Sequence, residues 1–196
     1  GLYKLGDFPS KNTFTWNGHF RDDLRRFWKG DKDTAWNMSD KIKGTPSIYK
    51  EDNIFPKSIN FITSHDGFTL KDLVTFNRKH NFANREQNRD GDNHNNSWNH
   101  GTEGPTTNLL INDLRKRQQK NLILSLLISK GVPMILMGDE IGRSQGGNNN
   151  SWCQNNLLGW MNWEHGQQDL ELLEYFKYVI KIRKKLINIF NPSFFP

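Results

Sequence analysis

The 196-residue sequence contains a single cysteine, Cys153, and no long apolar run. One cysteine excludes a disulfide within the chain and favours a reducing compartment. No stretch approaches the roughly 20 apolar residues of a membrane span, and the first residues lack the basic start and apolar middle of a signal peptide. We therefore expect a protein of the cytoplasm, or of the plastid stroma in a photosynthetic eukaryote, with no membrane partner.

Several motifs that mark common chemistries are also missing. No glycine-rich phosphate motif precedes a helix, and no G-x-S-x-G nucleophile turn occurs. The histidines show no i, i+4 spacing on a helix, and "DGDNHN" lacks the sixth-position glycine and the terminal acid of a calcium loop. The sequence therefore predicts no bound metal and no cofactor.

The net charge of +6 and the pI of about 9.4 invite a nucleic-acid hypothesis. However, acids interrupt the cations, as in "RDDLRRFWKGDKD", and no long basic run occurs. We interpret the charge as a solvated surface and expect no nucleic-acid partner. The alternative would show itself as salt-sensitive retention on DNA.

The pattern of apolar residues predicts an α/β chain. β-forming stretches occur at residues 13–16, 58–63 and 133–137, the last two typical of buried strands. Helical periods occur at residues 19–29, 36–42, 70–76, 112–131 and 168–187, and Thr69 with Asp72 resembles a capping box. Strand, polar loop and helix in repetition predict a parallel sheet with its site at the carboxyl ends of the strands. Three strands cannot cover both faces of such a sheet, so the pattern indicates part of a larger barrel.

Polar side chains follow each of the two firm strands. His65 and Asp66 stand at the end of an apolar run, directly before a glycine and a helix start, and this placement favours a functional role. Asp139 and Glu140 have the same placement. Acids at such positions are often structural, and we favour that interpretation for this second pair.

Two long loops, residues 80–108 and 142–156, are rich in Asn and Gly and contain Trp residues, among them Trp98. Amides donate and accept hydrogen bonds, and aromatic faces cover the apolar faces of sugar rings. The loops therefore favour a carbohydrate ligand, while each single Trp could equally be packing under a loop.

Two long segments carry a resemblance to a known family. They are "SINFITSHDGFTLKDLVTFNRKHNFANREQNRDGDNHNNSWNHGTEGPT" and "GVPMILMGDEIGRSQGGNNNSWCQ", and "GLYKLGDFP" and "FRDDLRRFWKGD" extend the match over nearly the whole chain. The sequence resembles the isoamylase and glycogen-debranching branch of the α-amylase superfamily of glycoside hydrolases. Arg85 stands where the family pattern "ANGE" would have glycine.

The resemblance implies that residues 1–190 are the C-terminal portion of a (β/α)₈ TIM barrel, about strands six to eight with their helices. Residues 191–196 would begin a truncated C-terminal β-domain. It assigns Asp66 as a catalytic carboxylate that stabilises the transition state, and His65 and Trp98 as substrate-binding residues. The nucleophile and the acid/base would precede Gly1, so the fragment alone is expected to be inactive.

The activity that the resemblance implies for the parent protein is retaining hydrolysis of α-1,6-glucosidic branch linkages in glycogen, amylopectin or limit dextrin. Two alternatives stay open. The parent could be an α-1,4-acting or transglycosylating member of the superfamily, or the chain could be a noncatalytic glucan-binding remnant.

Overall fold

The computed structural model describes residues 5–7, 13–49, 57–164 and 166–190. The chain divides into two compact units. The first unit consists of Gly1–Ile62, Leu122–Met134 and Lys177–Pro196, and the second of Thr63–Asn121 and Ile135–Phe176. Two long helices, α4 (Leu109–Ile128) and α5 (Gln167–Phe190), contribute residues to both units.

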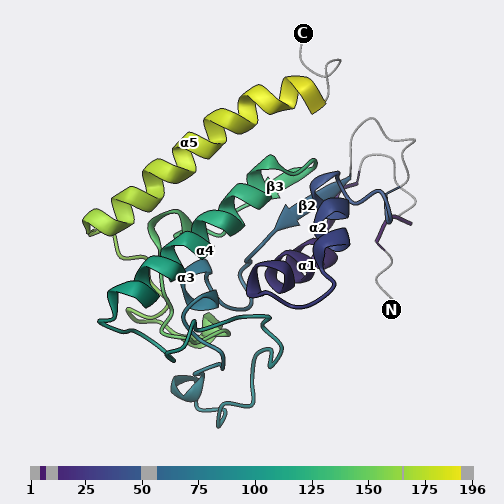
Figure 1. Ribbon diagram of the computed structural model, residues 1–196. Helices are drawn as coiled ribbons and strands as arrows, with labels where there is room; N and C mark the ends of the chain where they lie inside the picture. Colours follow the sequence, from purple (N-terminus) through teal and green to yellow (C-terminus); the bar gives the residue numbers. More distant parts are fainter. Residues whose placement is uncertain (1–4, 8–12, 50–56, 165, 191–196) are drawn as a thin grey trace. The chain divides into compact units, whose positions relative to one another are not determined.

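A three-stranded parallel sheet forms the centre of the first unit (Figure 1). Its strands are β1 (Thr15–Trp16), β2 (Ser58–Phe61) and β3 (Val132–Met134), in that spatial order. β2 pairs in parallel with both neighbours. The predicted parallel α/β arrangement is confirmed, although each strand is shorter than its apolar stretch suggested.

The two strands predicted to be buried differ in their exposure. Ser58, Asn60 and Phe61 of β2 are buried, as expected for a central strand. β3 was expected to be buried as well, but Val132 is 38% exposed. The physical reason is position, because β3 pairs only with β2 among the described residues and so lies at an edge of the sheet.

Helix α1 (Gly18–Lys29) packs against β2 and against α2 (Ala35–Ile42) (Figure 1). Asn17 caps its start, accepting a hydrogen bond from the Phe20 N–H at 2.9 Å, and Gly30 ends it with a φ of 92°. Phe20 and Leu24 are fully buried on the predicted apolar stripe. The caps and the stripe together explain why the helix forms where the period predicts it.

Buried polar side chains link the sheet to its connections. Asn17 donates to the Ser58 hydroxyl at 2.9 Å, Ser58 donates to Asn60 at 2.6 Å, and Asn60 donates to the Lys130 carbonyl at 2.7 Å. Gly131 follows with a φ of 116°, and a Cβ there would lie 2.7 Å from the Asn60 amide nitrogen. This network therefore requires glycine at the entrance to β3.

The second unit is built mostly of loops around short helical turns. These are α3 (Leu70–Leu73) and the 3₁₀ turns η1 (Phe82–Asn84), η2 (Asp139–Ile141) and η3 (Ser151–Cys153). The first parts of α4 and α5 complete the unit. α4 begins three residues earlier than predicted because Asn108 accepts hydrogen bonds from the N–H groups of Leu110 and Ile111.

Helix α3 was predicted to continue to Phe76 but has only four residues. The carbonyl of its last residue accepts a hydrogen bond from the long loop instead of from the next helical turn, and so does the Thr75 carbonyl just beyond the helix. Trp98 N–H donates to the Leu73 carbonyl at 3.1 Å, and Gly104 N–H donates to the Thr75 carbonyl at 3.0 Å. The loop therefore ends the helix by supplying the hydrogen bonds that continuation would have provided.

The predicted domain boundary at residues 191–196 lies outside the described residues. No helix within the described parts of the chain is long and apolar enough to cross a membrane.

Candidate functional site

The His65–Asp66 pair lies in the short connection between β2 and α3. Both side chains are exposed, by 70% and 78% respectively, and His65 Nε2 lies 3.1 Å from Asp66 Oδ2. The residues on either side, Thr63 and Phe68, are buried. An imidazole and a carboxylate thus stand in solvent on a connection whose two ends are packed. We name residues 63–69 the tip.

Asp139 forms hydrogen bonds at both ends of the tip. Its carboxylate accepts hydrogen bonds from the Thr63 hydroxyl and from the Leu70 N–H, the latter at 2.9 Å. Asp139 is 3% exposed. Glu140 beside it accepts from the Gly138 N–H at 2.8 Å. The structural interpretation of this acidic pair is therefore supported, since Asp139 ties together the two ends of the segment that carries His65 and Asp66.

The second asparagine-rich loop holds the tip from another side. Gly67 N–H donates to the Asn149 carbonyl at 2.9 Å. Asn149 and Asn81 exchange two hydrogen bonds, since Asn81 Nδ2 donates to Asn149 Oδ1 at 2.8 Å and Asn149 N–H donates to Asn81 Oδ1 at 2.9 Å. Both asparagines are buried. The tip is thereby connected to both long loops through one amide pair.

A second reciprocal pair joins the same loops further out. Asn148 Nδ2 donates to Asn84 Oδ1 at 2.8 Å, and Asn84 Nδ2 donates back to Asn148 Oδ1 at 3.4 Å and to the Asn150 carbonyl at 2.8 Å. Asp90 accepts from both Asn84 and Asn150. The sequence suggested that the amides serve a sugar ligand, but these amides mainly bind one another. Many asparagines of the two loops are therefore structural.

Asp72 anchors the second loop to α3. It is fully buried and accepts from the Ser144 hydroxyl at 2.5 Å and from the Gln145 N–H at 2.7 Å. Burial raises the pKa of its carboxyl, against the lowering effect of these hydrogen bonds. The predicted capping role of Thr69 is confirmed, because its hydroxyl accepts from the Asp72 N–H at 3.2 Å.

Trp98 lies at the opposite end of α3 from the tip. The residue is 41% exposed, and its ring stacks on His100, with ring centroids 4.4 Å apart and planes inclined by 29°. His100 is buried, and its Nδ1 bonds the Val74 carbonyl at 3.0 Å. Burial lowers the pKa of His100, which favours the neutral ring.

The predicted site residues are bonded to opposite ends of α3. At its start, Leu70 N–H donates to Asp139, which also binds the tip that carries His65 and Asp66. At its end, the Leu73 carbonyl accepts from Trp98 N–H. A four-residue helix is about 6 Å long. The structure therefore attaches His65, Asp66 and Trp98 to a single rigid turn within the same unit.

Two residues that the sequence did not single out hold the Trp98 loop. Glu103 accepts from the N–H groups of Asn77 and Arg78 at 2.8 and 3.1 Å and bonds His80 at 2.9 Å. Arg115 is buried and donates to carbonyls of the same loop, among them that of Gly104 at 2.9 Å. Neither residue belongs to a recognisable motif, and only the fold shows that backbone groups converge on them.

Hydrogen bonding dominates the electrostatics of Glu103. Partial burial acts to raise the pKa of its carboxyl, but the bonds from Asn77, His80, Asn99 and Arg78 lower the pKa to about 2.

No group of three or more His, Cys, Asp and Glu side chains among the described residues is placed to hold a metal ion.

Several known proteins are similar in sequence to this chain over nearly its whole length. A GlgX homologue of the glycogen operon from Mycobacterium tuberculosis is 46% identical over 185 residues, which cover 94% of the chain and 26% of the relative. The chloroplastic isoamylase 1 of rice is 44% identical over 187 residues, covering 94% and 23%. A glycogen debranching enzyme from Erwinia tasmaniensis is 43% identical over 185 residues, covering 94% and 28%. The chain spans about a quarter of the length of these relatives.

Solved structures share the fold. A pullulanase from Bacillus acidopullulyticus aligns with a TM-score of 0.63 and 20% identity, over 89% of this chain and 19% of its own. A type I pullulanase from Bacillus subtilis, solved with maltose, aligns with a TM-score of 0.60 and 22% identity, over 87% and 22%. No protein-family model matches the chain. The resemblance predicted from the motifs is confirmed: over some 185 residues the chain is homologous to part of the isoamylase and glycogen-debranching proteins.

Proposed function

We propose that this chain is part of a debranching enzyme that hydrolyses α-1,6-glucosidic linkages in a branched α-glucan. The observation that carries the proposal is an exposed His65–Asp66 pair on a tip held by hydrogen bonds at both ends, in a chain homologous to debranching proteins. The substrate would be glycogen, amylopectin or limit dextrin. The protein would act in the cytoplasm, or in a plastid as the name of the rice relative suggests.

In this proposal the chain supplies about strands six to eight of a (β/α)₈ barrel within residues 1–190. Three parallel strands in the order β1, β2, β3, joined by helical crossovers, support it, as does the alignment with pullulanase. The tip would then stand at the carboxyl end of the seventh strand, on the face where barrel enzymes place their sites.

Asp66 would act on the transition state. Cleavage of a glycosidic bond passes through an oxocarbenium-like state, and a nearby carboxylate stabilises its positive charge. His65 would donate a hydrogen bond to a hydroxyl of the same sugar, and the exposed face of Trp98 would cover the apolar face of a ring. The hydrogen bonds from Thr63 and Leu70 to Asp139 would keep these groups in place before the substrate binds.

A retaining reaction also needs a nucleophile and an acid/base about 5 Å apart. By the resemblance, those acids follow the fourth and fifth strands of the barrel, outside the portion proposed for this chain. We therefore propose that the 196 residues alone do not turn over substrate. Sustained release of linear chains from branched glucan by the purified chain would contradict this part of the proposal.

The decisive experiment is Asp66→Asn in the complete enzyme. Loss of the negative charge should lower kcat by about a hundredfold or more, as removal of other transition-state charge partners does. Release of reducing ends from branched glucan measures it. The matched control is Asp113→Asn, which makes the same change at an exposed position of α4. Equal turnover of the two variants would overturn the assignment.

A noncatalytic glucan-binding remnant is the second candidate, because the partly exposed Trp98 could contact a sugar whether or not hydrolysis occurs. Trp98→Ala separates sugar contact from catalysis. If the chain binds glucan, this variant should weaken binding by about 1 kcal/mol or more even where no hydrolysis occurs. Products from branched and linear oligosaccharides would distinguish α-1,6 hydrolysis from an α-1,4-acting or transglycosylating enzyme.

A further inference from the structure

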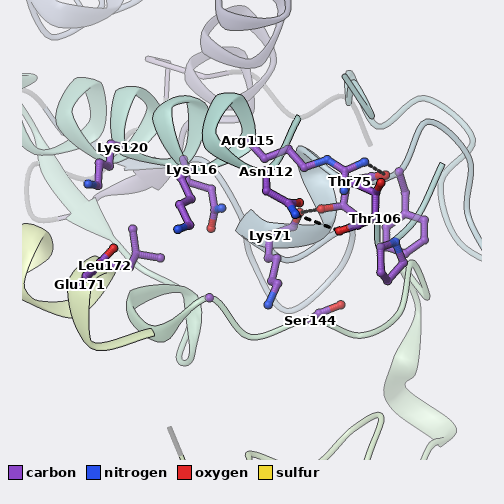
Figure 2. Close-up of a pocket in the computed structure, with 14 residues that line it drawn as sticks. Lys71, Thr75, Thr106, Asn112, Arg115, Lys116, Lys120, Ser144, Glu171 and Leu172 are labelled. Carbon is purple, nitrogen blue, oxygen red and sulfur yellow. Dashed lines mark hydrogen bonds between the residues drawn. The ribbon is translucent and has the colours of Figure 1, made fainter. Parts of the chain in front are cut away.

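A cavity of about 230 Å³ lies within the second unit, and no residue of the tip lines it (Figure 2). Its walls come from α3 and the residues after it, residues 105–106 of the long loop, the first turns of α4, Gly142 and Ser144, and the start of α5. None of His65, Asp66 and Trp98 lines it. The cavity is therefore separate from the proposed catalytic tip.

Three lysines make the cavity strongly positive. Lys71, Lys116 and Lys120 line it, against a single acid, Glu171. Figure 2 shows Lys71 and Lys116 extending from α3 and α4 toward the same open space, which Ser144 borders. No salt bridge involves any of the three lysines within the described part of the chain. Lys120 Nζ lies over the Tyr175 ring, 5.4 Å from its centroid. Ammonium groups without an acidic partner around a hollow attract an anion.

The fourth cation of the wall serves a different purpose. Arg115 is buried, and its guanidinium donates to the carbonyls of Asn99, Thr102 and Gly104 at 2.8, 2.5 and 2.9 Å. These bonds hold the wall in shape and leave the lysines as the groups that face a ligand. The hydrogen bonds of Arg115 therefore fix the wall on which the lysines stand.

Gln119 indicates what else the ligand must carry. It lines the cavity, is only 7% exposed, and its buried Oε1 has no hydrogen-bond partner among the described residues. A buried acceptor without a partner is unfavourable, so a ligand that donates a hydrogen bond there would be favoured. A fully ionised inorganic anion such as sulfate has no donor, whereas a sugar hydroxyl has one.

The size of the cavity limits the ligand to about one sugar. Its 230 Å³ lies below the roughly 300–1,000 Å³ of pockets for drug-sized molecules, which favours a ligand of about one sugar over a glucan chain. We propose that this cavity binds a small phosphorylated sugar, with the phosphate among Lys71, Lys116 and Lys120 and a hydroxyl donating to Gln119. This inference goes beyond the proposed function, because neither the ligand nor the lining residues take part in glucan cleavage.

Isothermal titration calorimetry of the full chain tests the proposal with four probes: glucose 6-phosphate, glucose, inorganic phosphate and sulfate. Glucose 6-phosphate should bind at least about tenfold more tightly than any of the other three, a difference of about 1.4 kcal/mol. Sulfate binding as tightly as the sugar phosphate would overturn the role of Gln119. Absence of binding by the sugar phosphate would overturn the site itself.

Variants separate a specific site from general attraction. Lys116→Glu should weaken glucose 6-phosphate binding about tenfold or more, because it reverses a charge that faces the ligand. Arg117→Glu makes the same charge change one residue along α4, at an exposed position outside the cavity lining, and should leave binding nearly unchanged. An equal effect of the two variants would overturn the proposal.

Gln119→Leu tests the binding role of Gln119 in a protein that should still fold. It replaces an amide whose buried Oε1 has no hydrogen-bond partner among the described residues by an apolar side chain, so the circular dichroism spectrum and melting temperature should be retained. Binding of glucose 6-phosphate should still fall severalfold, while binding of inorganic phosphate should change little. Unchanged sugar-phosphate binding in a folded Gln119→Leu protein would contradict the assignment. These measurements need no hydrolysis, so failure here leaves the proposed debranching function untouched, and the reverse also holds.

Discussion

Asp139 accepts a hydrogen bond from the backbone N–H of Leu70 at 2.9 Å, across nearly seventy residues of sequence. Its other carboxylate oxygen accepts a hydrogen bond from the Thr63 hydroxyl. The acid that follows β3 therefore fastens the two ends of the tip that follows β2, and His65 and Asp66 stand between those ends. The exposed pair owes its fixed position to an acid that is itself buried.

Asp139→Asn should destabilise the fold by about 1.5–3 kcal/mol, because an amide can accept with only one atom and turns its N–H₂ toward a donor. Urea unfolding of the variant and of wild type measures the loss. Asp113→Asn, at an exposed position on α4, is the matched control and should stay within about 0.5 kcal/mol of wild type. Equal stability of the two variants would show that the hydrogen bonds of Asp139 to Thr63 and Leu70 contribute little to the free energy of unfolding.

Gly91→Ala should disrupt the amide pair that joins the two loops. A Cβ at Gly91 would lie 2.2 Å from Asn149 Oδ1 and 2.7 Å from Asn81 Nδ2, and φ is 73°. Gly101→Ala is a close control, because Gly101 also has a positive φ, 101°, but no atom within 4 Å of its Cβ position. Both variants should lose stability through backbone strain, and Gly91→Ala should lose about 1–3 kcal/mol more through overpacking. Thermal melts of both proteins would reveal whether this difference exists.

Arg85→Gly should stabilise the protein. Arg85 ends η1 in the left-handed region, with φ of 61° and ψ of 19°, where a side chain is strained. Glycine relieves roughly 1–2 kcal/mol of strain but costs about 0.5–1 kcal/mol in the unfolded chain, so a net gain of about 0.5–1 kcal/mol is expected. Arg89→Gly, outside the positive-φ set, should instead lose stability. A loss in both variants would contradict the argument.

Local sequence patterns predicted the elements well, because their causes are local. The apolar stripe of α1, its glycine stop and the Thr69 cap all depend on residues within a few positions of one another. The glycine that the family pattern places at position 85 also agrees with the backbone there, which is left-handed. Such features can be recognised from one sequence.

Long-range hydrogen bonds explain what the sequence could not predict. α3 ends early because Trp98 N–H binds the Leu73 carbonyl and Gly104 N–H binds the Thr75 carbonyl just beyond the helix. Nothing near Val74 in the sequence signals this. The asparagines of the two loops were interpreted as ligand groups, but Asn81 and Asn149 bind each other across 68 residues. Exposure of His65 and Asp66 fits the predicted tip, while their role in catalysis stays a prediction.

Acid should loosen the loop that carries Trp98, because Glu103 holds it through hydrogen bonds that require a carboxylate. The pKa of Glu103 is about 2 in the folded protein, against an ordinary value of 4.5. A depressed folded pKa means that the carboxylate stabilises the fold fully above pH 4.5 and that this contribution disappears as pH falls toward 2.

Glu103→Gln should therefore flatten the dependence of unfolding free energy on pH between about 4.5 and 2, measured by denaturant titration at each pH. The variant should also be less stable than wild type at pH 7, where the charged acceptor is lost. Glu86→Gln, at an exposed position of the same loop, should keep the wild-type slope. If Glu103→Gln keeps that slope as well, other carboxylates control acid unfolding and the loop is not held by the charge of Glu103.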